Sequence, residues 1–117
     1  MDNKILIILD HGSRSKLAQE DLDNLCHNVS EMGNIPCFGA HLEIAKPDLI
    51  QTIEKIKGKA KNICVFPLFL AQGRHLSEDV PELIQKAKST FPDLNISLLD
   101  GLRNNPLLTK LIINSLT

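Results

Sequence analysis

Two short segments in which nearly every residue is apolar limit what this chain of 117 residues can fold into. Residues 4–9 read KILIIL and residues 62–70 read NICVFPLFL, with no regular alternation of polar and apolar side chains. A strand with one face in water alternates, whereas a strand covered on both faces is apolar throughout. The two segments therefore predict buried strands of a parallel sheet.

Segments with helical spacing lie between these runs and two further strand-like runs, residues 36–42 and 95–99. In each segment, apolar side chains recur three or four positions apart, which places them on one face of a helix. The predicted faces comprise Leu22, Leu25, Cys26, Val29 and Met32; Leu49, Ile50, Ile53 and Ile56; Val80, Leu83, Ile84 and Ala87; and Leu108, Leu111 and Ile112. Strand and helix alternate four times, which predicts one α/β domain over residues 1–117, with a four-stranded parallel sheet and helices on both faces.

Residues that favour helix ends indicate where the helices begin and stop. Gly33 and Gly58 are expected just after the first two helices. The predicted start signals are Pro47 in the first turn of the second helix; Glu78 and Asp79 at the start of the third, with Pro81 in its first turn; and Asn105 followed by Pro106 for the fourth.

Composition excludes several classes of protein. The 13 Lys and Arg residues nearly balance the 14 Asp and Glu residues, so a nucleic-acid partner is not expected. No apolar run approaches the ~20 residues of a membrane span, and the first residues carry no secretory pattern, so we expect a cytoplasmic protein without a membrane partner. Cys26, Cys37 and Cys64 form no Cys-x-x-Cys pair and are expected to be small buried residues.

Polar and charged residues follow the predicted ends of three strands. In chain order they are His11, Arg14, Glu43, Arg74 and His75. Because ligands of an open parallel α/β sheet bind beyond the carboxyl ends of its strands, we expect these side chains to converge on one rim. Gly12 and Gly73 lie beside the histidines, where a bare backbone lets a ligand come close.

Two imidazoles with a carboxylate suit a weak, open site for cobalt, nickel, iron or zinc ions. A neutral imidazole can also accept a proton near neutral pH. His11 alone could be a loop residue with one backbone hydrogen bond, but its convergence with His75 favours a function. His27 lies on the polar face of the first helix and receives no role, and the role of His41 stays open.

Three blocks of sequence carry a family resemblance. The chain resembles the small class II sirohydrochlorin chelatases, which insert cobalt, iron or nickel into sirohydrochlorin. The blocks are His11-Gly12-Ser13-Arg14, Leu42-Glu43-Ile44-Ala45-Lys46-Pro47, and Pro67-Leu68-Phe69-Leu70-Ala71-Gln72-Gly73-Arg74-His75 followed by Asp79-Val80-Pro81. The resemblance spans essentially the whole chain and implies a chelatase-like fold, a flavodoxin-like half unit.

The resemblance also implies roles for particular residues. His11 and His75 would be the metal ligands, and His11 would accept a pyrrole proton. Residues lining the tetrapyrrole would be Leu70, Ala71, Gln72, Gly73 and Arg74. The resemblance further implies a homodimer, because the larger chelatases look like two fused copies of this unit. A second subunit would also close the shallow ledge that 117 residues offer to a macrocycle.

Sirohydrochlorin is a flat apolar ring edged with carboxylates, which requires an apolar ledge and scattered cations. The sequence can supply these with Leu42, Leu68, Leu70 and Leu76, and with Arg14, Lys46 and Arg74. Ser13 and the backbone of the turn before the first helix could hold one carboxylate of the ring. Glu43 is a second candidate, beside His11, for removing pyrrole protons.

The sequence departs from the family's pattern in two places. Lys46 stands where the family usually has a glutamate before the proline, and the histidine-rich insertion of some nickel-inserting members is missing. The predicted function is therefore a lyase that inserts cobalt, or iron, for cobalamin or sirohaem biosynthesis. The metal is a substrate, and no cofactor is expected to stay bound. A metal carrier using the same two histidines and a nickel-inserting chelatase are the alternatives.

Overall fold

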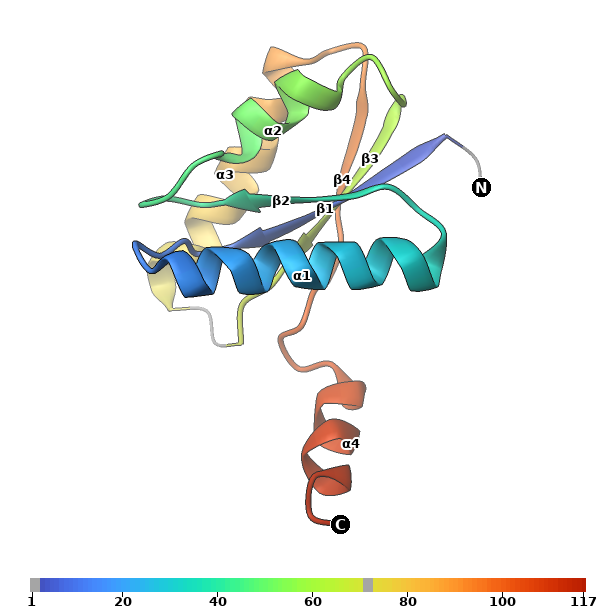
Figure 1. The fold of residues 1–117 in the computed structure, drawn as a ribbon. Coiled ribbons are helices and arrows are strands. Elements are labelled where there is room, and N and C mark those ends of the chain that lie inside the picture. The colour runs from blue at the N-terminus through green and yellow to red at the C-terminus, as the bar shows by residue number, and fades with distance from the viewer. Residues whose placement is uncertain (1–2, 71–72) are drawn as a thin grey trace.

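The computed structural model describes residues 3–70 and 73–117, in which four strands and four helices alternate (Figure 1). The strands are β1 (Lys4–Asp10), β2 (Cys37–His41), β3 (Asn62–Pro67) and β4 (Asn95–Leu98). The helices are α1 (Lys16–Gly33), α2 (Leu49–Ile56), α3 (Arg74–Thr90) and α4 (Pro106–Asn114). The predicted four-stranded parallel sheet is confirmed, with the strand order β2-β1-β3-β4.

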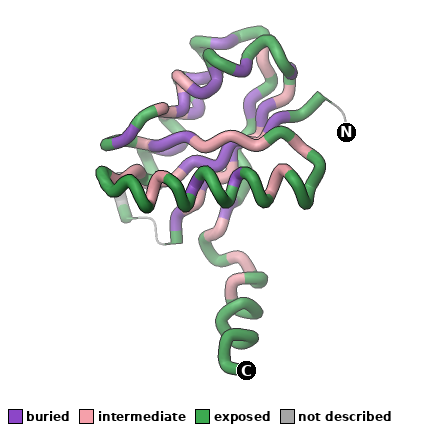
Figure 2. The backbone as a smooth tube through the Cα atoms, viewed as in Figure 1, coloured by how far each residue is buried: buried purple, intermediate pink, exposed green. Residues whose placement is uncertain are grey.

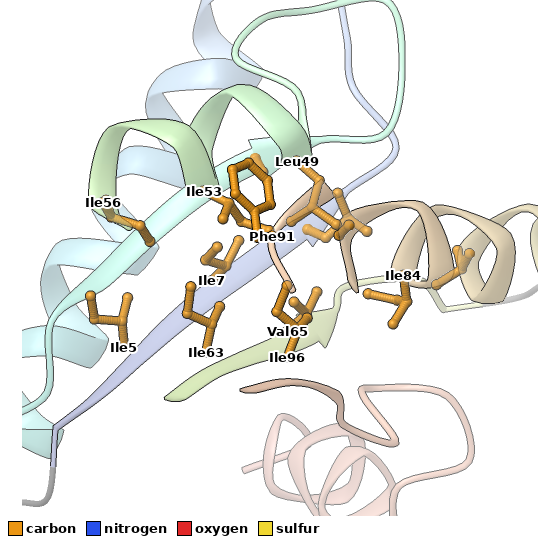
Figure 3. Close-up of a cluster of buried hydrophobic side chains, with 14 of the residues drawn as sticks. Ile5, Ile7, Leu49, Ile53, Ile56, Ile63, Val65, Ile84, Phe91 and Ile96 are labelled. Atoms are coloured by element: carbon orange, nitrogen blue, oxygen red, sulfur yellow. The ribbon is translucent and has the colours of Figure 1, made fainter. Parts of the chain in front are cut away.

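Strand β1 is covered on both faces, which explains why its sequence is apolar throughout. Ile5, Ile7 and Leu9 belong to the larger core, which fills the space between the sheet and helices α2 and α3 (Figure 3). Ile8 points to the opposite face and packs with Leu22 of α1. Successive side chains of a strand face opposite ways, so each face of β1 needs its own apolar set.

Helix α1 buries a narrower stripe than its spacing predicts. Leu22 and Cys26 are buried, but Leu25 is 36% exposed and Met32 is 92% exposed. The helix crosses only one face of a small sheet, so it has no second surface against which a wider stripe could pack (Figure 1).

Two predicted helix starts are wrong. Helix α2 is capped by Asp48, whose carboxylate accepts from the Gln51 amide at 2.8 Å, so Pro47 precedes the helix instead of lying in its first turn. Helix α3 starts at Arg74, directly after Gly73, so Glu78 and Asp79 lie beyond its first turn and Pro81 lies inside the helix. Leu76 is the one apolar residue in this first part of α3, too few to show a periodic apolar pattern before Val80.

Helix α4 extends away from the sheet (Figure 1). Its start is as predicted, because the Asn105 side chain accepts a hydrogen bond from the Leu107 amide at 2.9 Å. Its expected burial against the sheet is wrong: Leu111 is 62% exposed and Ile112 60% exposed, and the helix is green and pink in Figure 2.

All three cysteines are free thiols, and Cys26 is buried as expected, whereas Cys37 and Cys64 are half-buried. A hydrogen bond from Cys26 to the Cys37 sulfur raises the pKa of Cys26, which burial raises further, and lowers the pKa of Cys37. Among residues 3–70 and 73–117, no helix has the length and apolar content needed to cross a bilayer.

Truncating a side chain should cost far more stability on the buried face of β1 than at the exposed end of α1. Ile7 is fully buried, so Ile7→Ala should lower the free energy of unfolding by about 3 kcal/mol, through lost burial and a cavity. Met32→Ala, at the exposed end of α1, should change it by less than about 0.5 kcal/mol. Urea unfolding of both variants measures this; equal losses would contradict the assignment of Met32 to the surface.

Candidate functional site at the carboxyl edge of the sheet

The loops that follow β1 and β2 bring His11 and Glu43 together. His11 Nε2 and Glu43 Oε2 are 3.8 Å apart, and both side chains are about half exposed. The loops are joined by backbone hydrogen bonds: the Leu42 amide donates to the Asp10 carbonyl at 2.8 Å and the Glu43 amide donates to the His11 carbonyl at 3.1 Å. At this distance the imidazole and the carboxylate are not hydrogen-bonded, but both are close enough to face one cation, as the sequence predicts for this rim.

Gly12 allows the two loops to approach this closely. Its φ of 104° is a conformation that side chains disfavour, and a Cβ at this position would lie 1.8 Å from the Glu43 carbonyl oxygen. Any larger residue would therefore have to push the loop carrying Glu43 away from His11. The glycine that the sequence suggests for ligand approach serves here to pack one loop on the other.

A second polar pair, of buried His41 and half-buried Asp10, lies at the strand ends that precede Glu43 and His11. Asp10 Oδ1 and His41 Nδ1 are 2.6 Å apart, and His41 is 5% exposed. The two residues are register partners at the ends of β1 and β2. His41, whose role the sequence leaves open, is thus a buried partner of Asp10.

Glu43 also borders a cavity of about 420 Å³ on the side of helix α3. Its lining combines three carboxylates, one lysine and two leucines: Glu43, Asp79, Glu82, Lys86, Leu42 and Leu83. The excess of negative charge suits a cation better than a carboxylate-edged ring. Among the described side chains, however, no three His, Cys, Asp or Glu residues are arranged to hold an ion.

The third loop of the rim follows β3. This strand ends at Pro67, earlier than the predicted 62–70, and the Leu68 amide makes a further bond to the Leu9 carbonyl at 2.7 Å. Phe69 is then buried, whereas Leu70 is 64% exposed. The chain therefore leaves the sheet here, at its carboxyl edge.

The predictions for Ala71 and Gln72 lie outside the described residues, as do the side chains of Arg74 and His75. The backbone places Arg74 and His75 in the first turn of α3, after the N-cap Gly73. Since α3 follows the carboxyl end of β3, position 75 belongs to the same sheet edge as His11.

The residues expected to hold the ring's carboxylates are spread along this edge. Ser13 Oγ accepts from the Ser15 amide at 3.0 Å, and Ser15, not Ser13, caps α1. Arg14 is exposed on the same loop. Lys46 lines a separate groove of about 630 Å³ between α2 and the end of α3, together with Ile50 and Phe91.

The leucines of the expected apolar ledge are divided between the two faces of the sheet. Leu42 and Leu76 pack against the core under α2 and α3, and Leu68 packs against the cluster under α1. Leu70 is the most exposed of the four. The ledge that the described residues offer is therefore narrower than the sequence suggests.

Sequence reasoning missed Asp10, Asp79 and Glu82 as neighbours of the rim. Asp10 and His41 could have been paired only by knowing the register of β1 and β2. Asp79 and Glu82 could have been placed only by knowing that α3 begins at Arg74, because that start determines which helix face borders Glu43.

Replacing Gly12 should disturb both loops at once. Gly12→Ala forces a side chain into the positive-φ region and against a carbonyl, so the free energy of unfolding should fall by more than about 2 kcal/mol. Gly58→Ala is the matched control, because a Cβ there meets nothing within 4 Å. Urea denaturation compares them, and a Gly12→Ala protein as stable as Gly58→Ala would rule out the loop contact.

Comparisons with known proteins agree with this arrangement. The CbiX family model matches residues 5–117. The sirohydrochlorin cobaltochelatase of Methanocaldococcus jannaschii is 37% identical over 81 residues, covering 68% of this chain and 57% of the relative. The chloroplastic sirohydrochlorin ferrochelatase of Arabidopsis thaliana is 32% identical over 92 residues, 77% of this chain and 41% of the relative. The chain thus spans about half the length of these curated relatives.

Solved structures give the same result. A CbiX protein from Marinobacter aquaeolei VT8 superposes with a TM-score of 0.83 at 30% identity, covering 97% of this chain and 91% of that one. The sirohydrochlorin chelatase SirB from Bacillus subtilis subspecies spizizenii, in complex with cobalt, gives 0.82 at 26% identity, covering 99% of this chain and 50% of that one. With a parallel sheet, a histidine–carboxylate pair at its carboxyl edge and a family match over nearly its whole length, the chain belongs to the CbiX family.

Proposed function

We propose that the protein is a metal chelatase, a lyase that inserts cobalt or iron into sirohydrochlorin. The observation that carries the proposal is the His11–Glu43 pair, 3.8 Å apart, at the sheet edge that also receives the first turn of α3 with His75. Relatives named as cobaltochelatases and ferrochelatases support this substrate, and so does a SirB structure in complex with cobalt.

The reaction exchanges two pyrrole protons for one divalent cation. In the proposed mechanism, His11 and His75 present the cation through neutral imidazole nitrogens, since a protonated imidazole has no lone pair for a metal. Glu43 or His11 accepts the pyrrole protons, and the exposure of both side chains lets these protons pass to water. The negative cavity formed by Glu43, Asp79 and Glu82 favours the arrival of a cation at this edge.

The ring would lie over the carboxyl edge, against Leu70 and residues 71–74, with Ser13, Arg14 and Lys46 near its carboxylates. Arg14 and Lys46 are exposed, so both can extend toward a ligand that lies above the loops. In this proposal the metal is a substrate, and no cofactor stays bound. We also propose a cytoplasmic location, which the three free thiols favour.

Removing either histidine should abolish metal insertion. His11→Ala and His75→Ala should each lower the rate of sirohydrochlorin metallation by at least about 100-fold, because each removes a ligand or proton acceptor. His27→Ala, on the exposed surface of α1, is the matched control and should keep the wild-type rate. The absorbance change of sirohydrochlorin with Co²⁺ or Fe²⁺ measures the reaction.

The same assay separates the chelatase from its alternatives. A wild-type protein that binds Co²⁺ but leaves the spectrum of sirohydrochlorin unchanged would be a metal carrier, which the acidic cavity could also serve. Faster reaction with Ni²⁺ than with Co²⁺ or Fe²⁺ would identify a nickel-inserting enzyme. Near-normal turnover of either histidine variant would contradict the proposed roles.

A homodimer is the second part of the proposal. Helix α4 exposes Leu107, Leu111, Ile112 and Ile113, all more than half exposed, and it projects from the sheet (Figure 1). So many exposed apolar side chains on one helix are typical of a protein–protein contact. SirB, half of which this chain covers, has room for a second unit of this size within one chain.

A charge on the apolar surface of α4 should separate the subunits. Leu111→Asp should convert the dimer to a monomer at micromolar concentration, because it would bury an unpaired carboxylate in the contact. Thr109→Asp introduces the same charge at a polar, exposed position of α4 and should leave the dimer intact. Sedimentation velocity distinguishes the two; a wild-type protein that sediments as a monomer would contradict the dimer.

A further inference from the structure

The pair Asp10–His41 has no part in the proposed chemistry, yet Asp10 directly precedes His11 and His41 lies two residues before Glu43. His41 Nδ1 and Asp10 Oδ1 are 2.6 Å apart, with side-chain exposures of 6% and 24%. A carboxylate oxygen only accepts hydrogen bonds, so Nδ1 carries the proton and donates. A bond this short to a charged acceptor is among the stronger and more directional hydrogen bonds of proteins.

The pair lies at the end of the β1–β2 ladder, on the face of the sheet covered by α1. Ile8 and Cys37 belong to the apolar cluster under α1, and residues two and four positions further along a strand point to the same face. Asp10 and His41 are therefore polar residues at the end of an otherwise apolar layer. An apolar pair could fill this space without losing hydration, so hydrophobic burial alone does not account for a carboxylate and an imidazole here.

His41 also closes the base of the loop that carries Glu43. Its backbone amide donates to the Pro47 carbonyl at 2.9 Å. This bond joins the two ends of the loop of residues 42–46. On the other side, the Asp10 carbonyl accepts from the Leu42 amide at 2.8 Å. The side-chain bond thus joins Asp10, which precedes His11, to His41, which anchors the loop that carries Glu43.

We propose that Asp10 and His41 are positioning residues, whose side-chain hydrogen bond fixes the separation of His11 and Glu43. The effect of that separation on catalysis rests on the proposed function. The positioning itself can be measured without an activity assay. Without the bond, the ends of β1 and β2 are held only by backbone bonds, and the Glu43 carboxylate can move relative to the His11 imidazole. Misplacement of a reacting group by about 1 Å can cost about 100-fold in rate.

The test removes both partners together, so that no unpaired charge remains. In Asp10→Val/His41→Leu, kcat for metallation of sirohydrochlorin should fall at least about tenfold while KM changes less than about threefold, because alignment and not binding is lost. His41→Asn keeps a donor near the position of Nδ1 and should restore kcat to within about threefold of the wild type. Thr52→Val, the control, removes another buried hydrogen bond donor beside β2 and should leave kcat unchanged.

Amide hydrogen exchange reads the positioning independently of catalysis. The Leu42 and Glu43 amides, which donate to the carbonyls of Asp10 and His11, should exchange at least about tenfold faster in the double variant, while the Ile7 amide stays protected. If the wild-type protein lacks chelatase activity but the double variant still shows this faster exchange, the proposed function fails and the positioning stands. If the double variant does not fold, Asp10→Ala with His41→Asn replaces it, and the same exchange and kcat changes are expected.

Two results would overturn the proposal. The first is a folded double variant whose Leu42 and Glu43 amides exchange as in the wild type and whose kcat is unchanged. The second is a His41→Asn protein as slow as the double variant, because the imidazole would then act through something other than its hydrogen bond to Asp10.

Discussion

Parallel pairing of β1 with both β2 and β3 makes all three strands end at the same edge of the sheet. The pairing is possible because β1 buries side chains on both faces, with Ile7 toward α2 and α3 and Ile8 toward α1. A strand that was polar on one face could not occupy this central place. His11, Glu43 and the first turn of α3 each follow one of these strands, so their convergence depends on this one apolar strand.

Much of this architecture could be predicted from the sequence, because burial on two faces leaves a continuous apolar run and helix packing leaves a periodic one. The four strands, the parallel sheet and the Asn105 cap follow from such local signals. The start of α3 could not be predicted, since Leu76 is the one apolar residue among residues 74–79, and a single apolar residue does not distinguish a helix turn from a loop. The exposure of α4 could not be predicted either, because an apolar helix face shows that it needs a partner but not which one.

At the site, the sequence predicts which loops converge but not how their side chains meet. His11 and Glu43 come together as expected, because each directly follows a strand of known direction. The bond between Asp10 and His41 depends on strand register, and the acidic lining from Asp79 and Glu82 depends on the rotation of α3. Lys46, which the sequence predicts beside the ring's carboxylates, also borders the groove near Ile50, because the chain after Glu43 leads into α2. Register and rotation arise from packing of the whole molecule.

The close approach between Gly12 and the loop after β2 involves the Glu43 backbone carbonyl and not its side chain. The spacing of the two loops therefore does not depend on which side chain occupies position 43. The hydrogen bonds from the Leu42 and Glu43 amides join backbone to backbone and do not depend on side-chain identity either. Scaffold and reactive groups are in this sense separable. Descendants of this fold could exchange the donor atoms at positions 11 and 43, and with them the preferred ion, without rebuilding the frame that holds them.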